Sequence, residues 1–266
     1  MREPMIDMLR LLAHLSTGER CLVPDFYKDV RVLNAEERRR YAEIVDLLSS
    51  HEQHRRQRRV EGTNSSHEYH DQSCSSTSTP TALQPMTTME SLMARWRFPS
   101  LSIHSVNVSG SGNSTVIPAV VCAKISVRLV PDQCLAEIQD SLQRFLETTF
   151  QSLYADSLSH QRQNQLSISI HHTADWWLGS PTSPYTTTLA SSIESTWNQP
   201  PLEIREGGSI PTVAILEKEL KAEAVHLPMG QSSDSAHLKD ERISLECLRK
   251  GREVVERWLT TLGGEM

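Results

Sequence analysis

Apolar residues recur at helical spacing at both ends of the chain. Between positions 5 and 15 they return every three or four residues, and Gly18 follows them, which predicts an amphipathic helix. Asn34 and Glu37 form a capping box, so a second helix is expected after Asn34. A last helix is expected from about Asp240, with apolar residues again at this spacing: Cys247, Leu248, Val254, Val255, Trp258 and Leu259.

The middle of the chain alternates apolar and polar residues instead. Residues 101–108 and 116–131 are predicted to form two strands joined by SGSGNST, with Arg128 on the face opposite the core. The stretch from Leu135 to Leu146 has the apolar stripe of a helix, and residues 166–172 predict a further strand. The order helix, strand, strand, helix, strand is that of a ferredoxin-like unit without its first strand. Such a unit would carry an unpaired sheet edge, which predicts poor solubility or pairing with another chain.

Strands and helices alternate from residue 173 onward. A helix is expected from Ser183, a short strand at 202–204, a helix at 213–220 and a strand at 222–228, before the last helix. This alternation indicates a parallel α/β layer, although two strands are too few to stand alone. The sequence therefore predicts an α+β unit followed by the incomplete C-terminal part of an α/β domain.

Residues 51–90 differ from the rest of the chain. They contain few apolar residues and no period, so we expect an exposed, disordered insertion. Its histidines raise the possibility of a metal site and its arginines that of a nucleic-acid site. A solvated loop is the favoured interpretation, because HEYH lacks the HExxH spacing that places two imidazoles on one helix face.

Composition narrows the class of protein. The 266 residues are 38% hydrophobic, with a net charge of -6 and only 5% aromatic residues, which argues against a nucleic-acid partner. The five cysteines are scattered, as in proteins of a reducing compartment. No apolar run approaches the length of a membrane span, and Glu3 and Asp7 argue against a signal peptide. We therefore expect a cytoplasmic protein that does not bind a membrane.

Two glycine-rich loops are candidates for anion binding. In REGGSIP (205–211), the backbone amides and Ser209 precede a predicted helix, so they suit a carboxylate at the helix N-terminus, and equally an ordinary βα turn. Ser209 is not expected to be a nucleophile, because the stretch is not G-x-S-x-G. SGSGNST (109–115) is followed by a strand, which favours a hairpin loop over a phosphate site.

Histidines provide the candidate metal ligands. His172 is in phase with the apolar residues of its predicted strand, which favours a half-buried histidine. His237 follows Asp234 by three residues, so it could equally be a metal ligand or a surface histidine. No histidine stands in H-x-D, and helix capping explains the one Glu-Glu pair, at positions 36–37. The chain therefore does not contain the five or six ligands of a dinuclear zinc site.

Four motifs carry a resemblance to a known family. PSLSIHSVNVSGSGNSTVIPAVVCAKISVRLVP, HHTADWWLG, REGGSIP and LPMGQSSDSAHLKDER occur in the order and spacing of the carnosinase-like di-zinc metallopeptidases. The residues of these motifs most resemble those of the peptidase-like subunit of the fungal glutathione-degradation complex. The resemblance covers about residues 2–50 and 92–262. It implies that residues 1–172 are a lid and dimerisation domain, and that residues 173–266 are the last part of the catalytic peptidase domain.

The resemblance also implies roles for individual residues. His237 matches the last zinc ligand, and His172 matches the histidine that stabilises the developing oxyanion. Two lid residues, Arg128 and Thr115, match residues that reach into the partner subunit's active site and hold the substrate. The remaining matches form the carboxylate-binding loop: Glu206, Gly208 and Ser209.

The family's H-x-D, bridging aspartate, Glu-Glu pair and further acidic ligand are absent from this sequence. The resemblance implies that a full-length form hydrolyses dipeptides or small peptides with zinc-activated water, in glutathione catabolism for example, as a homodimer through the lid. This chain alone is expected to be inactive, because the general base belongs to the absent pair. The alternatives are a non-catalytic scaffold or dimerisation subunit for a glutaminase-like partner, and a truncated gene product.

Overall fold

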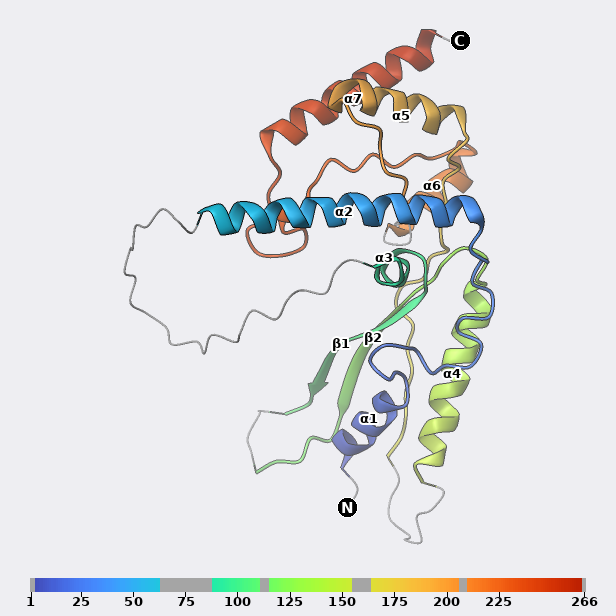
Figure 1. Cartoon of the computed structure of the whole chain (residues 1–266). Coiled ribbons are helices and arrows are strands. Elements are labelled where there is room, and N and C mark those ends of the chain that lie inside the picture. Colours follow the sequence, from blue (N-terminus) through green and yellow to red (C-terminus); the bar gives the residue numbers. More distant parts are fainter. Residues whose placement is uncertain (1–2, 63–87, 111–114, 155–163, 206–209, 265–266) are drawn as a thin grey trace. The chain divides into compact units, whose positions relative to one another are not determined.

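A computed structural model describes residues 3–62, 88–110, 115–154, 164–205 and 210–264 of the chain (Figure 1). The chain forms two compact units. The larger unit consists of residues 1–31 and 98–266, and the smaller unit of residues 32–97. The predicted domain boundary at residue 172 lies within the larger unit and stays a prediction. In the described residues no helix is long and apolar enough to cross a membrane.

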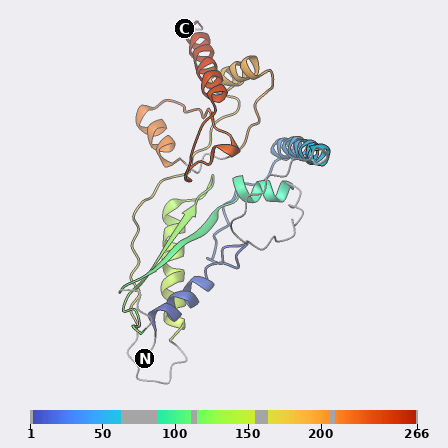
Figure 2. The same ribbon diagram turned by 90° about the vertical axis from the view of Figure 1, so that its left-hand side faces the viewer.

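The first part of the larger unit combines two helices with a hairpin. Its elements are α1 (Pro4–Ala13), β1 (Ser100–Val108), β2 (Val121–Arg128) and α4 (Leu135–Ser152). All four correspond to elements that the sequence predicts. The helix α1 contacts both β2 and α4, and α4 runs along the hairpin (Figure 2). Pro4 starts α1 without losing a hydrogen bond, because the first helical N–H has no partner inside the helix.

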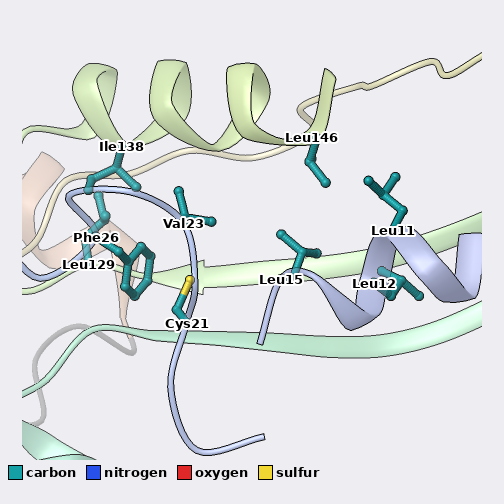
Figure 3. Close-up of a cluster of buried hydrophobic side chains, with 9 residues drawn as sticks. All are labelled: Leu11, Leu12, Leu15, Cys21, Val23, Phe26, Leu129, Ile138 and Leu146. Atoms are coloured by element: carbon teal, nitrogen blue, oxygen red, sulfur yellow. The ribbon is translucent and has the colours of Figure 1, made fainter. Parts of the chain in front are cut away.

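A single apolar cluster holds this part together (Figure 3). Phe26 and Leu15 are 1% and 0% exposed and lie at its centre, in the segment between α1 and residue 31. The buried members of the cluster come from this segment, the end of β2 and one stripe of α4: Leu11, Leu12, Leu15, Cys21, Val23, Phe26, Leu129, Ile138 and Leu146. Burial raises the pKa of the Cys21 thiol, so this side chain behaves as a small apolar group.

The hairpin is antiparallel and contains one irregularity. Ile103 pairs with Ile125 and Ser105 pairs with Lys124, so His104 is an extra residue in β1. This is the pattern of a β-bulge. Ala123, Ile125 and Val127 of β2 pack against the apolar cluster, as the alternation in the sequence predicts.

Three predicted strands are not strands in the structure. Residues 166–172, 202–204 and 222–228 have no strand assignment, and the sheet of the described residues has two strands. The ferredoxin-like order is therefore present only as helix, strand, strand, helix, and the parallel α/β layer does not form in the described residues. The reason is that a strand exists through hydrogen bonds to a neighbouring strand, which these apolar segments do not have.

The C-terminal part of the larger unit is mainly helical. It contains α5 (Pro184–Trp197), α6 (Pro211–Leu220), the one-turn helix η2 (Ser232–Asp234) and α7 (Leu245–Gly264). Ser183 caps α5 as predicted, with its Oγ accepting the N–H of Tyr185. The helices α5 and α7 pack on one another. Trp258 Nε1 donates a hydrogen bond of 3.0 Å to the Tyr185 carbonyl across this contact.

The smaller unit pairs α2 (Ala35–Gly62) with α3 (Met89–Trp96). Asn34 Oδ1 accepts the Glu37 N–H at 2.8 Å, which fulfils the predicted cap of α2. The helix then continues through residue 62, whereas the sequence predicts an irregular insertion from about residue 51. Arg, Gln and Glu are good helix formers, so a polar stretch without an apolar stripe can still extend a helix. Residues 63–87 of the predicted insertion lie outside the described residues.

Candidate functional site

The loop of residues 227–242 is organised by the carboxylate of Asp234. Asp234 Oδ2 accepts the Gln231 N–H at 2.8 Å, and the Asp234 N–H donates to the Gln231 carbonyl at 3.0 Å. These two bonds close the single turn of η2, and Asp234 is buried. Asp234, the acid that precedes His237, thus holds the backbone of its own loop, a role that Asp commonly has in turns.

His237 follows this turn in a different environment. Its φ is +65°, in the left-handed region that is uncommon for residues other than glycine, and its ring is exposed. Ser235 and Asp240 are also left-handed, with φ of +55° and +66°. Three such residues within six positions show that the backbone around His237 is held in an unusual path, which is often found at functional sites.

Gly251 of α7 lies against Met229 at the start of this loop. It lies buried in α7, and a Cβ added there would come within 2.5 Å of Met229 Sδ and 2.9 Å of Met229 Cγ. A larger residue at this position would force the Met229 side chain to move. The contact places Met229 against α7, two positions before the Gln231–Asp234 turn.

We expect Gly251→Ala to lower the free energy of unfolding by about 1–2 kcal/mol, because overpacking of this kind costs more than alanine gains in helix propensity. Urea unfolding gives the magnitude, and NMR shifts of the His237 ring report the displaced loop. Gly263→Ala is the matched control on α7, since no heavy atom lies within 4 Å of its added Cβ. Met229→Ala should cost less in the Gly251→Ala background than alone. Equal effects of both glycine substitutions would contradict the contact.

The lid candidates lie on and beside the hairpin. Arg128 ends β2 on its outer face, and its Nη2 donates to the Phe98 carbonyl at 3.0 Å. Thr115 is exposed in the connection between the strands. His172 is exposed in a segment without secondary structure, so the expectation of a half-buried histidine is wrong. Without a paired strand, the segment has no buried face for this ring.

The carboxylate-loop candidates Glu206, Gly208 and Ser209 lie outside the described residues. The helix expected after them is present, because α6 starts at Pro211. Arg205, just before the loop, contributes to the electrostatics of Asp132. The pKa of Asp132 is lowered, first by its hydrogen bonds from Arg31, at 2.7 and 2.6 Å, and in smaller part by the charges of Arg31 and Arg205.

The described residues can be checked for a set of side chains that could bind a zinc ion. Among the described residues, no group of three or more His, Cys, Asp or Glu side chains lies close enough together to hold an ion. Zinc in proteins takes three or four protein ligands. Asp234 Oδ2, the nearest acid before His237 in the sequence, accepts the Gln231 N–H. The described residues therefore do not fit a complete zinc site by themselves.

Two adjacent tryptophans join the two parts of the larger unit, a structural role that the sequence analysis did not assign to them. Trp176 packs against the apolar cluster, and its Nε1 donates to the Gln133 carbonyl at 2.9 Å. Trp177 Nε1 donates to Glu217 of α6 at 2.9 Å, and its ring lies 5.0 Å from that of His226. The paired tryptophans of DWWLG were the signal, since two large side chains in succession seldom share one surface.

Comparisons with known proteins find that this chain is similar to peptidases, although no family model matches it. It is 32% identical to the probable di- and tripeptidase DUG2 of Saccharomyces cerevisiae over 92% of the chain and 23% of that protein. It is 30% identical to the Cys-Gly metallodipeptidase DUG1 of Candida albicans over 98% of the chain and 48% of the relative.

A solved structure shows the same likeness. Human carnosine dipeptidase 1 superimposes with a TM-score of 0.72 at 27% identity, over 97% of this chain and 49% of that structure. The chain thus spans about half the length of the Candida relative and of this structure, and about a quarter of the Saccharomyces protein.

Proposed function

We propose that this chain, a homologue of the Cys-Gly metallodipeptidases and of carnosine dipeptidase, takes part in the hydrolysis of dipeptides or other small peptides. The observation that carries the proposal is the extent of the similarity, which reaches 98% of the chain for the Candida dipeptidase. Peptides of glutathione catabolism are the first substrates to test, because Cys-Gly is the peptide in the name of that relative.

The proposed roles follow the motif positions. His237 is proposed as a zinc ligand, and His172 as the group that stabilises the oxyanion. Both rings are exposed, so both are accessible to a reacting group. The substrate is held by five further residues: Arg128, Thr115, Glu206, Gly208 and Ser209. In support, Arg128 lies on the outer face of β2, and the loop that contains the last three precedes the N-terminus of α6, where the helix dipole favours a carboxylate.

We further propose that residues 1–266 have no peptidase activity by themselves. The sequence has no H-x-D, and its one Glu-Glu pair lies in the first turn of α2. There the Glu37 carboxylate accepts a hydrogen bond from buried Arg97, at 3.3 Å, so it is not available as a general base. Water activation would therefore need groups from further polypeptide, whether in the same protein or in a partner.

Loss of an outer-shell partner lowers the activity of a metal site by up to about a hundredfold, and loss of a ligand itself should cost at least as much. We therefore expect His237→Ala to reduce dipeptide hydrolysis by at least about a hundredfold. The assay uses the protein purified from its native cells, with a Cys-Gly dipeptide as substrate. His171→Ala is the matched control, because His171 is also exposed and its ring lies within hydrogen-bond distance of Ser169, two positions away. If both variants retain full activity, the proposed role of His237 is wrong.

The isolated chain provides the complementary measurement. Residues 1–266 with added zinc should not hydrolyse the same dipeptide above the rate of the zinc solution alone. Turnover that His237→Ala abolishes would show that the chain is active alone, against the proposal.

A second candidate function is that of a scaffold or dimerisation subunit, with a glutaminase-like partner or a second copy of the chain. The favouring observation is an apolar surface on α6, where Ile215, Leu216 and Leu220 are 52%, 53% and 69% exposed. Exposed apolar groups that are contiguous mark interaction sites. Each strand of the hairpin also has one edge without a strand beside it in the described residues, which favours pairing with another chain. Co-purification that finds neither self-association nor a partner would count against this function.

A further inference from the structure

The outer face of the β1–β2 hairpin carries polar side chains and no acidic ones. Alternate residues of β2 point away from the apolar cluster, and among them are Lys124, Ser126 and Arg128. Neither SLSIHSVNV nor VCAKISVR contains Asp or Glu, although acidic residues outnumber Lys and Arg by 33 to 27 in the whole chain. This face therefore carries positive charge on a chain whose net charge is negative, which suits an anionic ligand.

The bulge in β1 adds a histidine to this face. His104 is the unpaired residue between Ile103 and Ser105, and its Nε2 lies 2.7 Å from Ser126 Oγ. Both side chains are exposed, as is Lys124, the partner of Ser105 across the hairpin. A bulge typically re-aims one side chain next to a functional site. Here it brings an imidazole to a hydroxyl beside a lysine, a set of donors that fits a carboxylate.

The spacing along β2 matches the length of a short peptide. Ser126 and Arg128 lie two residues apart on the same face, which corresponds to about 7 Å along a strand. Two residues of extended peptide also span about 7 Å at most. A dipeptide laid along β2 with one carboxylate at Arg128 would therefore bring its other end to Ser126, His104 and Lys124.

We propose that His104, Lys124 and Ser126 form a subsite for a second carboxylate, so that the preferred peptides carry an acidic side chain in addition to a carboxylate held at Arg128. This inference rests on the proposed function of Arg128 in substrate binding and specifies the substrate class of that site. Lys124 supplies the charge, while the His104–Ser126 pair supplies donors of fixed position.

The test compares two dipeptides that differ in one charge. The whole chain is titrated with glutamyl-glycine and with glutaminyl-glycine, and binding is followed by NMR shifts of the β1 and β2 amides. We expect the acidic peptide to bind about tenfold more tightly, the low end of the range for a hydrogen bond to a charged group. Lys124→Gln should remove this difference, and His104→Ala should reduce it. Lys28→Gln is the matched control, an exposed lysine outside the hairpin that makes the same change in charge.

Three results would overturn the subsite. The two peptides could bind the unsubstituted chain equally, neither could bind at millimolar concentration, or Lys28→Gln could act like Lys124→Gln. Equal thermal stability of Lys124→Gln and the unsubstituted chain excludes a folding effect. The proposed peptidase function fails on a different measurement, the loss of hydrolysis in His237→Ala. A chain that discriminates the two peptides without that loss would keep the subsite and reject the peptidase role of His237.

Discussion

Replacing Arg97 by methionine is expected to lower the free energy of unfolding of the smaller unit by about 3–5 kcal/mol, the cost of breaking a buried ion pair by removing one partner. Arg97 is 4% exposed and Glu37 is 8% exposed, and Arg97 Nε lies 3.3 Å from Glu37 Oε1. Without the guanidinium, the Glu37 carboxylate stays buried between α2 and α3 without its cation. Native-state hydrogen exchange of the α2 and α3 amides measures the loss.

The double variant separates burial of the charge from packing. Glu37→Leu in the Arg97→Met background should recover most of the lost stability, because an apolar pair of similar volume often replaces a buried ion pair at little cost. The exposed pair Arg39–Glu43 in α2 is the control, with N and O 3.0 Å apart. Arg39→Met should change stability by less than about 1 kcal/mol, as exposed ion pairs contribute little. An Arg97→Met variant as stable as Arg39→Met would refute the argument.

Asp7→Ala should destabilise the larger unit by about 2–4 kcal/mol, since hydrogen bonds to a charged group contribute about 1.5–3 kcal/mol each. Asp7 is 2% exposed in α1. Its Oδ2 accepts from Tyr154 Oη at 2.6 Å and from Asn164 Nδ2 at 2.8 Å, while Tyr154 Oη accepts the Asn164 N–H at 3.0 Å. One carboxylate thus joins α1, the end of α4 and the segment after residue 163. Urea unfolding monitored by circular dichroism gives the change.

Variants of the partners show whether the effect of Asp7→Ala comes from this network. Tyr154→Phe removes one donor to Asp7 and should cost less than Asp7→Ala. In the Asp7→Ala background, Tyr154→Phe should cost less again, because residues of one hydrogen-bond network are coupled. Strictly additive effects would show that Asp7 stabilises α1 in some other way.

Local signals in the sequence predicted most of the helices, but not α3 or the part of α2 after residue 50. The cap at Asn34, the start at Ser183 and the apolar stripe of α4 each depend on neighbours within a few positions, and each is present in the structure. The pairing of β1 with β2 was also within reach, because a short connection joins them. For residues 166–172 and 222–228, the local pattern indicates only that each segment is extended and apolar. Whether such a segment becomes a strand depends on a distant neighbour, which a local pattern does not specify.

The candidate site shows the same limit in its side chains. A histidine three residues after an acid left a metal ligand and a surface histidine equally open, because the number of residues between them does not reveal which way each side chain points. Asp234 turns to the Gln231 N–H and His237 is exposed. The β-bulge at His104 was equally hidden, because an extra residue in one strand is visible only against the register of its partner. The contact of Gly251 with Met229 depends on the distance between α7 and the Met229 side chain, which the sequence does not contain.

The contact between Met229 and Gly251 has a chemical consequence for the loop that carries His237. Oxidation of methionine to its sulfoxide adds an oxygen to the sulfur and makes an apolar side chain polar. The sulfur of Met229 already lies where even one added carbon on Gly251 would meet it at 2.5 Å. Oxidation of this half-buried thioether would therefore crowd the contact between Met229 and Gly251 of α7, and a sulfoxide reductase would restore that contact. The packing of Met229 against α7 depends in this way on the oxidation state of a single sulfur atom.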